Sequence, residues 1–396
     1  MAILPVEGRE IREGVDRLRT LVYPHSPEAF DVERHRSVWR WLETHPLAGE
    51  EMHRWAATAN GEVVGHLAAV PQHYRVGGRR VVAHTPTDYQ ALPAYGFQAF
   101  ALMRKFFGTV ENCVACDMVP EVIQVETRMG AETTGSLQYA AKLLDVSRLP
   151  VPRLPGPLER YLELEEEAAP ARGYGADPRH GAPAPPPVRR RLPIPGPVKA
   201  LLNRGLRAAD GALGSLSGTE LEVEEVEEFD ESFDALFERV AAAVPCVPEK
   251  DSAFLNWRYG PGSPQHPVTV LGVREGGRLL GYAVLRVTVK GQHGFRDAFI
   301  MDLTTVPGRS DVARALLREA VGVFRRAGAP IVRYRFLRSP SAPRPEDLLR
   351  LGFFNRNDRS NTLLVKFADE ALHEAALDTA RWSYNVGDGE ATFWLT

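Results

Sequence analysis

The stretch "NGEVVGHLAAV" (60–70) returns in related form as "GGRLLGYAVLR" (276–286). Each copy opens on a glycine-bearing turn and continues as an apolar run that contains one glycine. Turns of this kind connect the two strands of a hairpin, and aliphatic runs bounded by such turns are typical of strands. The sequence therefore predicts that one hairpin is built twice.

The segments on either side of the two hairpins also follow one order. For each copy the pattern predicts two helices, a meander of strands, a helix, a strand, a helix and closing strands. The first-copy segments are 13–25, 32–46, 53–59, 61–76, 79–92, 96–110, 113–119, 120–130 and 135–144. The second-copy segments are 230–244, 250–260, 267–275, 278–291, 296–308, 310–328, 329–337, 344–354, 361–369 and 389–396.

This order predicts the fold class. A helix that connects two strands of one sheet makes those strands parallel, whereas hairpins make antiparallel pairs. We expect an α/β protein of the mixed, α+β kind, with two lobes in tandem. Each lobe is a mostly antiparallel sheet of about six or seven strands, with one parallel pair and flanking helices.

The region between the lobes has a different composition. We place the first lobe at 1–148, the second lobe at 219–396 and a linker rich in proline at 149–218. Within the linker, 166–197 buries little apolar surface and is expected to be flexible or extended. The stretch 197–216 has leucines at helical spacing between basic residues. It is either a helix docked on a lobe, which we favour, or a peripheral membrane contact.

Composition excludes several classes of protein. The chain has 396 residues and a net charge of −3, so it offers no broad basic surface for nucleic acid. No apolar run approaches a membrane span, and the N-terminus is not a secretory signal. Three cysteines are too few for a disulfide framework, so we expect a reducing, cytoplasmic setting. Cys113 and Cys116 face opposite sides of a strand, which favours buried structural thiols over a metal site.

The order of elements, together with "RRVVAHTPTDYQALPAYGFQAF" and "DLTTVPG…LLRLGFF", resembles the GNAT superfamily of acyl-CoA N-acyltransferases, in tandem. It is similar to GNAT-type proteins encoded beside bacterial polysaccharide genes, and its two-lobe plan to the Fem-type transferases. The resemblance implies transfer of an acyl group, with acetyl as first expectation, to an amine of a small molecule or amino sugar. It implies acetyl-CoA or another acyl-CoA as co-substrate and no metal. A Fem-like aminoacyl transferase and a non-catalytic scaffold remain alternatives.

The resemblance also implies where the acyl-CoA binds. The family has a glycine-rich loop after the fourth strand, where backbone N–H groups at a helix start approach the pyrophosphate. The matching run here, "YQALPAYGFQAFALM" (89–103), is a degenerate version of this loop, but it has no carboxylate. The expected cofactor-binding residues are Gln90, Ala91, Leu92, Tyr95, Gly96, Phe97, Gln98, Ala99 and Phe100.

The corresponding loop of the second lobe is less suited to an anion. It reads "TTVPGRSDVARAL", in which Ser310 or Asp311 is the expected N-cap of the following helix. A capping carboxylate occupies the helix N–H groups and repels pyrophosphate. We therefore expect this lobe to be structural or to bind the acceptor.

The catalytic groups are less clearly marked. Family members often use a carboxylate as base and a tyrosine as acid, but Glu126 and Leu348 stand at the tyrosine positions of the two lobes. The candidates are Asp88, at the end of the fourth strand and our first choice, with Glu126 and His84. Tyr89 is a further candidate. Each has a structural alternative: a turn cap for Asp88, a solvated helix residue for Glu126 and a hydrogen-bonding strand residue for His84.

Four helix-borne aromatic residues are a last candidate feature. They line an acceptor groove or, as is more usual on helices, belong to the core. They are Trp39, Trp41, Trp257 and Tyr259.

Overall fold

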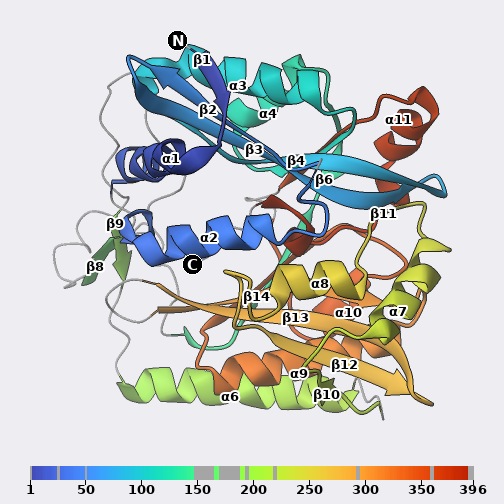
Figure 1. Cartoon of the computed structure of the whole chain (residues 1–396). Helices are drawn as coiled ribbons and strands as arrows, with labels where there is room; N and C mark the ends of the chain where they lie inside the picture. The colour runs from blue at the N-terminus through green and yellow to red at the C-terminus, as the bar shows by residue number, and fades with distance from the viewer. Residues whose placement is uncertain are drawn as a thin grey trace.

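The structure is a computed structural model of the chain. It describes residues 2–24, 27–49, 51–146, 165–168, 188–191, 196–216, 221–290, 295–356 and 361–390. Two mixed sheets, one above the other in Figure 1, organise these residues, and helices cover both sheets.

The first sheet consists of eight strands, of which only β4 and β5 are a parallel pair. Its order is β1 (Ala2–Pro5), β2 (His53–Ala59), β3 (Glu62–Val76), β4 (Arg79–Ala91), β5 (Cys113–Asp117), β17 (Thr362–Lys366) and β6 (Glu132–Ser136), with β11 (Cys246–Pro248) also paired to β3. The helices of this part are α1 (Gly8–Val22), α2 (Val32–Glu43), α3 (Gly96–Thr109) and α4 (Pro120–Arg128).

The second sheet has seven strands, and its parallel pair is β14 with β15. Its order is β10 (Glu224–Glu225), β12 (Thr269–Glu275), β13 (Arg278–Lys290), β14 (Phe295–Thr305), β15 (Ile331–Phe336), β7 (Gln138–Leu143) and β16 (Phe354–Asn355). Its helices are α7 (Glu231–Ala241), α8 (Ser252–Tyr259), α9 (Ser310–Arg326) and α10 (Pro345–Arg350), whereas α11 (Glu370–Leu377) packs on β3, β6 and β17 of the first sheet. The predicted fold class, two mixed sheets with one parallel pair each, is confirmed.

The repeated hairpin is present in both lobes with the same details. The turns at Asn60-Gly61 and Gly276-Gly277 have positive φ at both residues, the conformation of a tight two-residue turn. In both hairpins the register shifts a few residues before the turn. The internal glycines permit a helix to approach: a Cβ at Gly65 would lie 3.0 Å from Leu102 of α3, and one at Gly281 2.9 Å from Val312 of α9.

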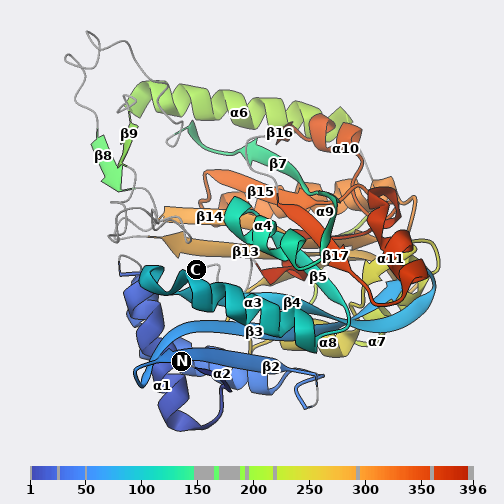
Figure 2. The ribbon, with the colours of Figure 1, turned by 90° about the horizontal axis from the view of Figure 1, so that it is seen from above.

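One part of the predicted strand assignment is wrong. We expected 135–144 to close the first sheet and 361–369 to close the second. Instead β7 lies between β15 and β16 of the second sheet, and β17 lies between β5 and β6 of the first. Figure 2 shows the exchange, with the teal β7 beside orange strands and the red β17 beside the teal β5. The exchange was not predictable because strand patterning specifies a buried face but not which sheet supplies the partner.

The aromatic helix residues lie in the core between the lobes, not on an open groove. Trp41 of α2 and Trp257 of α8 are stacked, with ring centroids 4.4 Å apart. Each indole N–H donates to the backbone carbonyl of the other residue, at 2.8 and 2.9 Å. Trp39 and Tyr259 are also buried. In Figure 1 both helices lie between the two sheets, so this reciprocal pair holds the lobes together.

The linker is described only in part. Its strands β8 (Glu165–Ala168) and β9 (Val188–Arg191) pair antiparallel, and the rest of 166–195 lies outside the described residues. Helix α6 (Gly196–Leu216) docks on the second lobe, where Asn203 accepts from the N–H of Val146 at 2.9 Å and Lys142 pairs with Asp210 at 2.6 Å. No helix among the described residues is long and apolar enough to cross a membrane. Of the predicted last strand, 391–396 lies outside the described residues.

Candidate active site at the splay of the first sheet

Strands β4 and β5 separate soon after they meet. Their parallel pairing is limited to His84 opposite Cys113, and beyond it β4 has an irregularity opposite His66 and Ala68 of β3. Within this bulge Asp88 has φ of 52°, which is uncommon for a residue other than glycine. We call the opening between β4 and β5 the first splay. Among the described residues, no strand pairs with β4 on that side beyond His84.

The first splay leads to the start of α3. The turn Pro93–Tyr95 precedes this helix, whose N-cap residue is Tyr95. The side chain of Tyr95 makes no capping hydrogen bond, and the first turn of the helix has no acidic residue. Phe97 is 77% exposed on this turn, and Gln98 is buried. The start of α3 therefore has the positive potential that suits an anion.

The expected cofactor-binding residues lie along one continuous path. Gln90 and Ala91 end β4, and Leu92 donates its N–H to the carbonyl of Val64 at 2.9 Å. The remaining residues form the turn and the first turn of α3. They are Tyr95, Gly96, Phe97, Gln98, Ala99 and Phe100.

Asp88 is buried and tied to the surrounding helices and strands. Its carboxylate pairs with Arg19 of α1 and lies 2.9 Å from Nδ1 of His66, and it accepts from Gln90 at 3.1 Å. Burial opposes ionisation of Asp88, but the charges of Arg19 and His66 outweigh it and hold its pKa below the usual value. A carboxylate with such partners is a weak base and a strong structural anchor.

His84 lies at the point where β4 and β5 last pair. Its Nε2 is 2.9 Å from the carbonyl of Glu51, and burial lowers its pKa. Its ring stacks on that of His53, with centroids 6.0 Å apart. Among the described contacts, none joins His84 to Asp88 or Glu126, so the structure does not bring the three candidates into one cluster.

Glu126 is not a solvated helix residue. Its side chain projects from α4 into the interior and is 1% exposed. Neither carboxylate oxygen has a hydrogen-bond partner within the described part of the chain. Burial, and then the charges of Asp117 and Glu390, raise the pKa of Glu126 well above its usual value. Of the sequence-derived candidates, Glu126 is the one whose carboxylate is unsatisfied.

Glu390 reaches this site from the far end of the chain. Its carboxylate accepts from the N–H of Asp88 at 3.0 Å. Burial, and then the charge of Asp117, raise the pKa of Glu390 well above its usual value. Sequence reasoning missed this residue, because it belongs to the second lobe in chain order and no local pattern marks it.

The segment before Glu390 occupies the equivalent opening of the second sheet. Beyond the last parallel pair of β14 and β15, Leu337 donates its N–H to the carbonyl of Tyr384 at 2.8 Å, and Asn385 bridges to Phe336. The side chain of Asn385 donates to Asp302 of β14 at 2.8 Å. We call this opening the second splay and Tyr384–Glu390 the C-terminal segment. The second splay is therefore filled by the chain itself.

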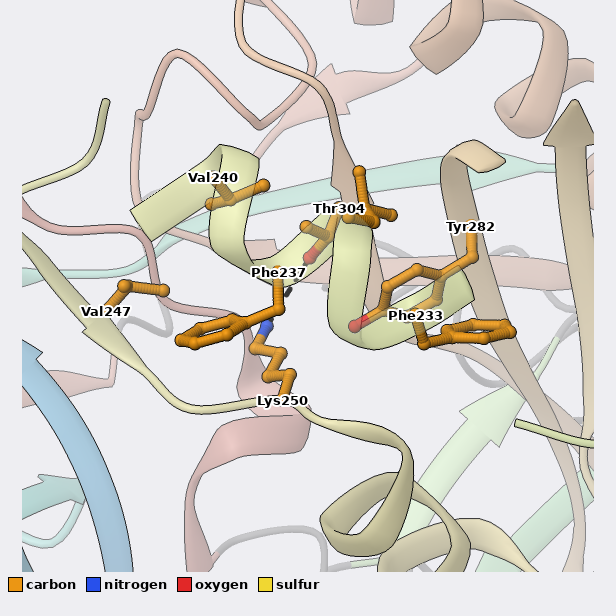
Figure 3. A pocket seen from close by; sticks show the side chains of 8 residues that line it. Phe233, Phe237, Val240, Val247, Lys250, Tyr282 and Thr304 are labelled. Carbon is orange, nitrogen blue, oxygen red and sulfur yellow. Dashed lines mark hydrogen bonds between the residues drawn. The ribbon is translucent and has the colours of Figure 1, made fainter. Parts of the chain in front are cut away.

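A buried polar network fixes the C-terminal segment there. Lys250 pairs with Asp302 at 3.0 Å and with Asp388 at 3.1 Å, and the hydroxyl of Tyr282 donates to Asp302 at 2.9 Å. Beside Lys250 and Thr304, α7 leaves a small cavity, shown in Figure 3. Its volume of about 10 Å³ accommodates roughly one water molecule. This cluster is a satisfied structural core rather than a ligand site.

The start of α9 differs from the prediction. The N-cap residue is Arg309, without a side-chain capping bond, so neither Ser310 nor Asp311 is the cap. Asp311 lies inside the first turn, where its carboxylate accepts from Arg309 at 2.8 Å. Ion pairing with the preceding arginine fixes Asp311 in this place. A negative charge is still present at this helix start, in contrast to α3.

The cysteines have no described ligand role. All three are buried and free, and Cys113 and Cys116 belong to clusters on opposite faces of the first sheet, as predicted. In the described ranges, no group of three or more His, Cys, Asp or Glu side chains is arranged to hold a metal ion.

Comparison with known proteins identifies the fold. No family model and no curated protein matches the sequence. Among solved structures, a GCN5-related N-acetyltransferase from Anabaena variabilis is 12% identical, with 94% of this chain and 74% of that chain covered and a TM-score of 0.53. A GCN5-related N-acetyltransferase from Kribbella flavida is also 12% identical, with 94% of this chain and 72% of that chain covered and a TM-score of 0.53. Saccharomyces cerevisiae N-myristoyltransferase with bound myristoyl-CoA is 9% identical, with 92% of this chain and 82% of that chain covered and a TM-score of 0.54. The two-lobed fold is thus that of N-acyltransferases, and at these identities the likeness concerns the fold alone.

Proposed function

We propose that this protein is an acyl-CoA-dependent N-acyltransferase with one active site, in the first lobe. The acceptor is an amine of a small molecule or an amino sugar, and acetyl is the first acyl group to test. The observation that carries the proposal is the conjunction of the first splay, the acid-free start of α3 and the unsatisfied carboxylate of Glu126.

The acyl-CoA is proposed to bind along the path from β4 to α3. The backbone N–H groups at the start of α3 receive the pyrophosphate, because the N-cap residue Tyr95 makes no side-chain capping bond and the helix dipole favours an anion. The backbone of β4 that faces the first splay hydrogen-bonds the extended arm of the cofactor. This path directs the thioester toward the interior, where Asp88, Glu126 and Glu390 lie.

Glu126 is proposed to move the proton during transfer. The neutral amine nitrogen attacks the thioester carbon, a C–N bond forms and the C–S bond breaks. The proton that leaves nitrogen passes to the Glu126 carboxylate and from there to the departing thiolate, so one group serves as base and then as acid. We assign this role to Glu126 rather than to Asp88, because Arg19 and His66 already neutralise Asp88. Asp88 then holds the bulge of β4 in place, and His84 supports the strand.

The second lobe is proposed to be structural. Its splay is filled by the C-terminal segment, and its equivalent helix start carries Asp311. A single molecule of acyl-CoA should therefore bind each chain.

Calorimetric titration with CoA tests the proposal. Ala99→Glu places a carboxylate at the start of α3 and should abolish binding, while its melting temperature stays near that of the wild type. Arg309→Ala alters the start of α9 and should leave affinity and the stoichiometry of one unchanged.

Two results would contradict the proposal. Retained binding in Ala99→Glu, or loss only in Arg309→Ala, would place the cofactor in the other lobe. Absence of binding to CoA, acetyl-CoA and longer acyl-CoAs would favour the non-catalytic scaffold.

A further inference from the structure

Beside the first splay, two carboxylates of the first lobe lie near a third from the far end of the chain. Glu126 comes from α4, Asp117 ends β5, and Glu390 ends the C-terminal segment. The position of Gly389 links two of them, since a Cβ built there would lie 3.2 Å from the Cβ of Cys116, the neighbour of Asp117. We call this group the acidic cluster.

The acidic cluster lacks a cation. Within the described ranges none of its members forms an ion pair, and neither oxygen of Glu126 has a partner. A buried carboxylate is normally hydrogen-bonded or paired, because removing its charge from water is costly. The nearby lysine, Lys366, donates instead to the carbonyl of Met129 at 3.0 Å. Since none of the described residues supplies this partner, we infer that a bound cation does.

The cluster has an accessible side. Glu126 is buried, whereas Asp117 and Glu390 are partly exposed. We call these two residues the rim. Asp117 is held by the N–H groups of Met118 and Val119, at 2.6 and 2.8 Å. Glu390 follows Gly389, whose carbonyl accepts from the buried Arg258 at 3.1 Å. Neither rim carboxylate can turn away easily to avoid the other negative charges.

We propose that the acidic cluster is the acceptor subsite and that it selects a cationic amine with no carboxylate beside the amino group. An ammonium group replaces the missing cation between Glu126 and the rim, and it loses one proton to solvent before the neutral nitrogen attacks the thioester. A carboxylate on the adjacent carbon, as in an α-amino acid, would be brought against two or three negative charges. The subsite therefore takes amines, polyamines or amino sugars and rejects α-amino acids. This inference rests on the proposed function for the role of the ligand as acceptor, but the cation binding itself does not.

The first experiment measures binding without acyl-CoA. Methylammonium is small enough to enter any cleft that takes an amine, so the melting temperature is followed in about 50 mM methylammonium, glycine or sodium chloride. We expect methylammonium to raise the melting temperature of the wild type by about 1–2 °C relative to the other two solutes. The rise should disappear in Glu126→Gln and in Glu390→Gln. It should persist in Glu121→Gln, which alters an exposed carboxylate on the same helix.

The second experiment compares acceptors in acyl transfer. Tyramine should exceed tyrosine in kcat/KM on the order of 100-fold, and tyrosine methyl ester should recover most of the difference. Cation binding without any acyl transfer would refute the proposed function and leave the subsite intact. Transfer with equal use of tyramine and tyrosine would overturn the subsite and leave the function intact. The absence of a methylammonium effect, or an equal effect in all variants, would also overturn the subsite.

Discussion

At the scale of single residues, two carboxylates of the first lobe have opposite electrostatic environments. The charges of Arg19 and His66 lower the pKa of Asp88 despite its burial, whereas burial and then neighbouring carboxylates raise the pKa of Glu126. A raised carboxyl pKa stabilises the fold fully below the pKa of the unfolded chain, and this stabilisation is lost as pH rises from there through the folded pKa. A lowered pKa acts in the opposite direction.

We expect Glu126→Gln to make the protein more stable and less active. Glutamine never ionises, so the variant avoids the cost that the wild type incurs as pH rises above about 4.3. The free energy of unfolding, from urea denaturation, should exceed that of the wild type by about 1 kcal/mol or more at pH 8 and differ little near pH 4. Turnover should fall on the order of 10²-fold.

Asp88→Asn is the contrasting variant. It leaves the buried guanidinium of Arg19 without one of its carboxylates, so we expect a loss of about 3 kcal/mol at pH 7. The loss should become smaller as pH falls toward the lowered pKa of Asp88. If Glu126→Gln were instead destabilising at pH 8, Glu126 would have a partner that neutralises it, and it would no longer be the proposed proton carrier.

At the scale of elements, the repeated hairpin shows what the sequence can specify. Its turn residues and internal glycines predicted the hairpins, and the sheets bear them out because turn chemistry is local. The start of α9 was misassigned by one or two residues, since an arginine side chain competes with the helix N–H groups for Asp311. The burial of Glu126 was not predictable, because in a nine-residue helix with charges on several sides the sequence pattern does not indicate which face is buried.

The internal glycines give a prediction at this scale. A methyl group at Gly281 would lie 2.9 Å from both Thr305 and Val312, and neither side chain is long enough to move aside. We expect Gly281→Ala to lower the free energy of unfolding by about 1–3 kcal/mol. Gly205→Ala on α6 is the control: a Cβ there meets nothing within 4 Å, so stability should rise by up to about 1 kcal/mol. Equal stability of the two variants would show that α9 does not pack closely on β13.

At the scale of the whole molecule, the two lobes cannot be separated along the chain. The predicted boundaries, 1–148 and 219–396, each omit a strand that lies inside the sheet of that lobe. Only contacts between residues remote in sequence determine this arrangement, and neither composition nor periodicity reports such contacts. The position of Glu390 likewise depends on contacts between residues remote in sequence, so the sequence alone did not predict that it joins the acidic cluster.

We expect fragments 1–148 and 219–396 to be unfolded or aggregated when each is expressed alone. The first lacks β17 between β5 and β6, and the second lacks β7 between β15 and β16. When co-expressed they should form a complex that co-elutes in size-exclusion chromatography and unfolds in one transition. A fragment that folds alone, with native circular dichroism and a cooperative transition, would argue against the exchange.

The exchanged strands also determine when the first sheet can be completed during synthesis on the ribosome. β5 emerges early, but the neighbour that covers its edge, β17, is made only after residues 118–361. Until then the nascent first lobe exposes an unpaired central strand, the kind of edge that recruits other chains. Pairing of β17 with β5 is therefore late and, because the two strands are far apart in sequence, slow. Until it occurs, the exposed edge of β5 needs protection from other chains. We therefore expect the placement of these two short strands to increase the need for chaperones during translation.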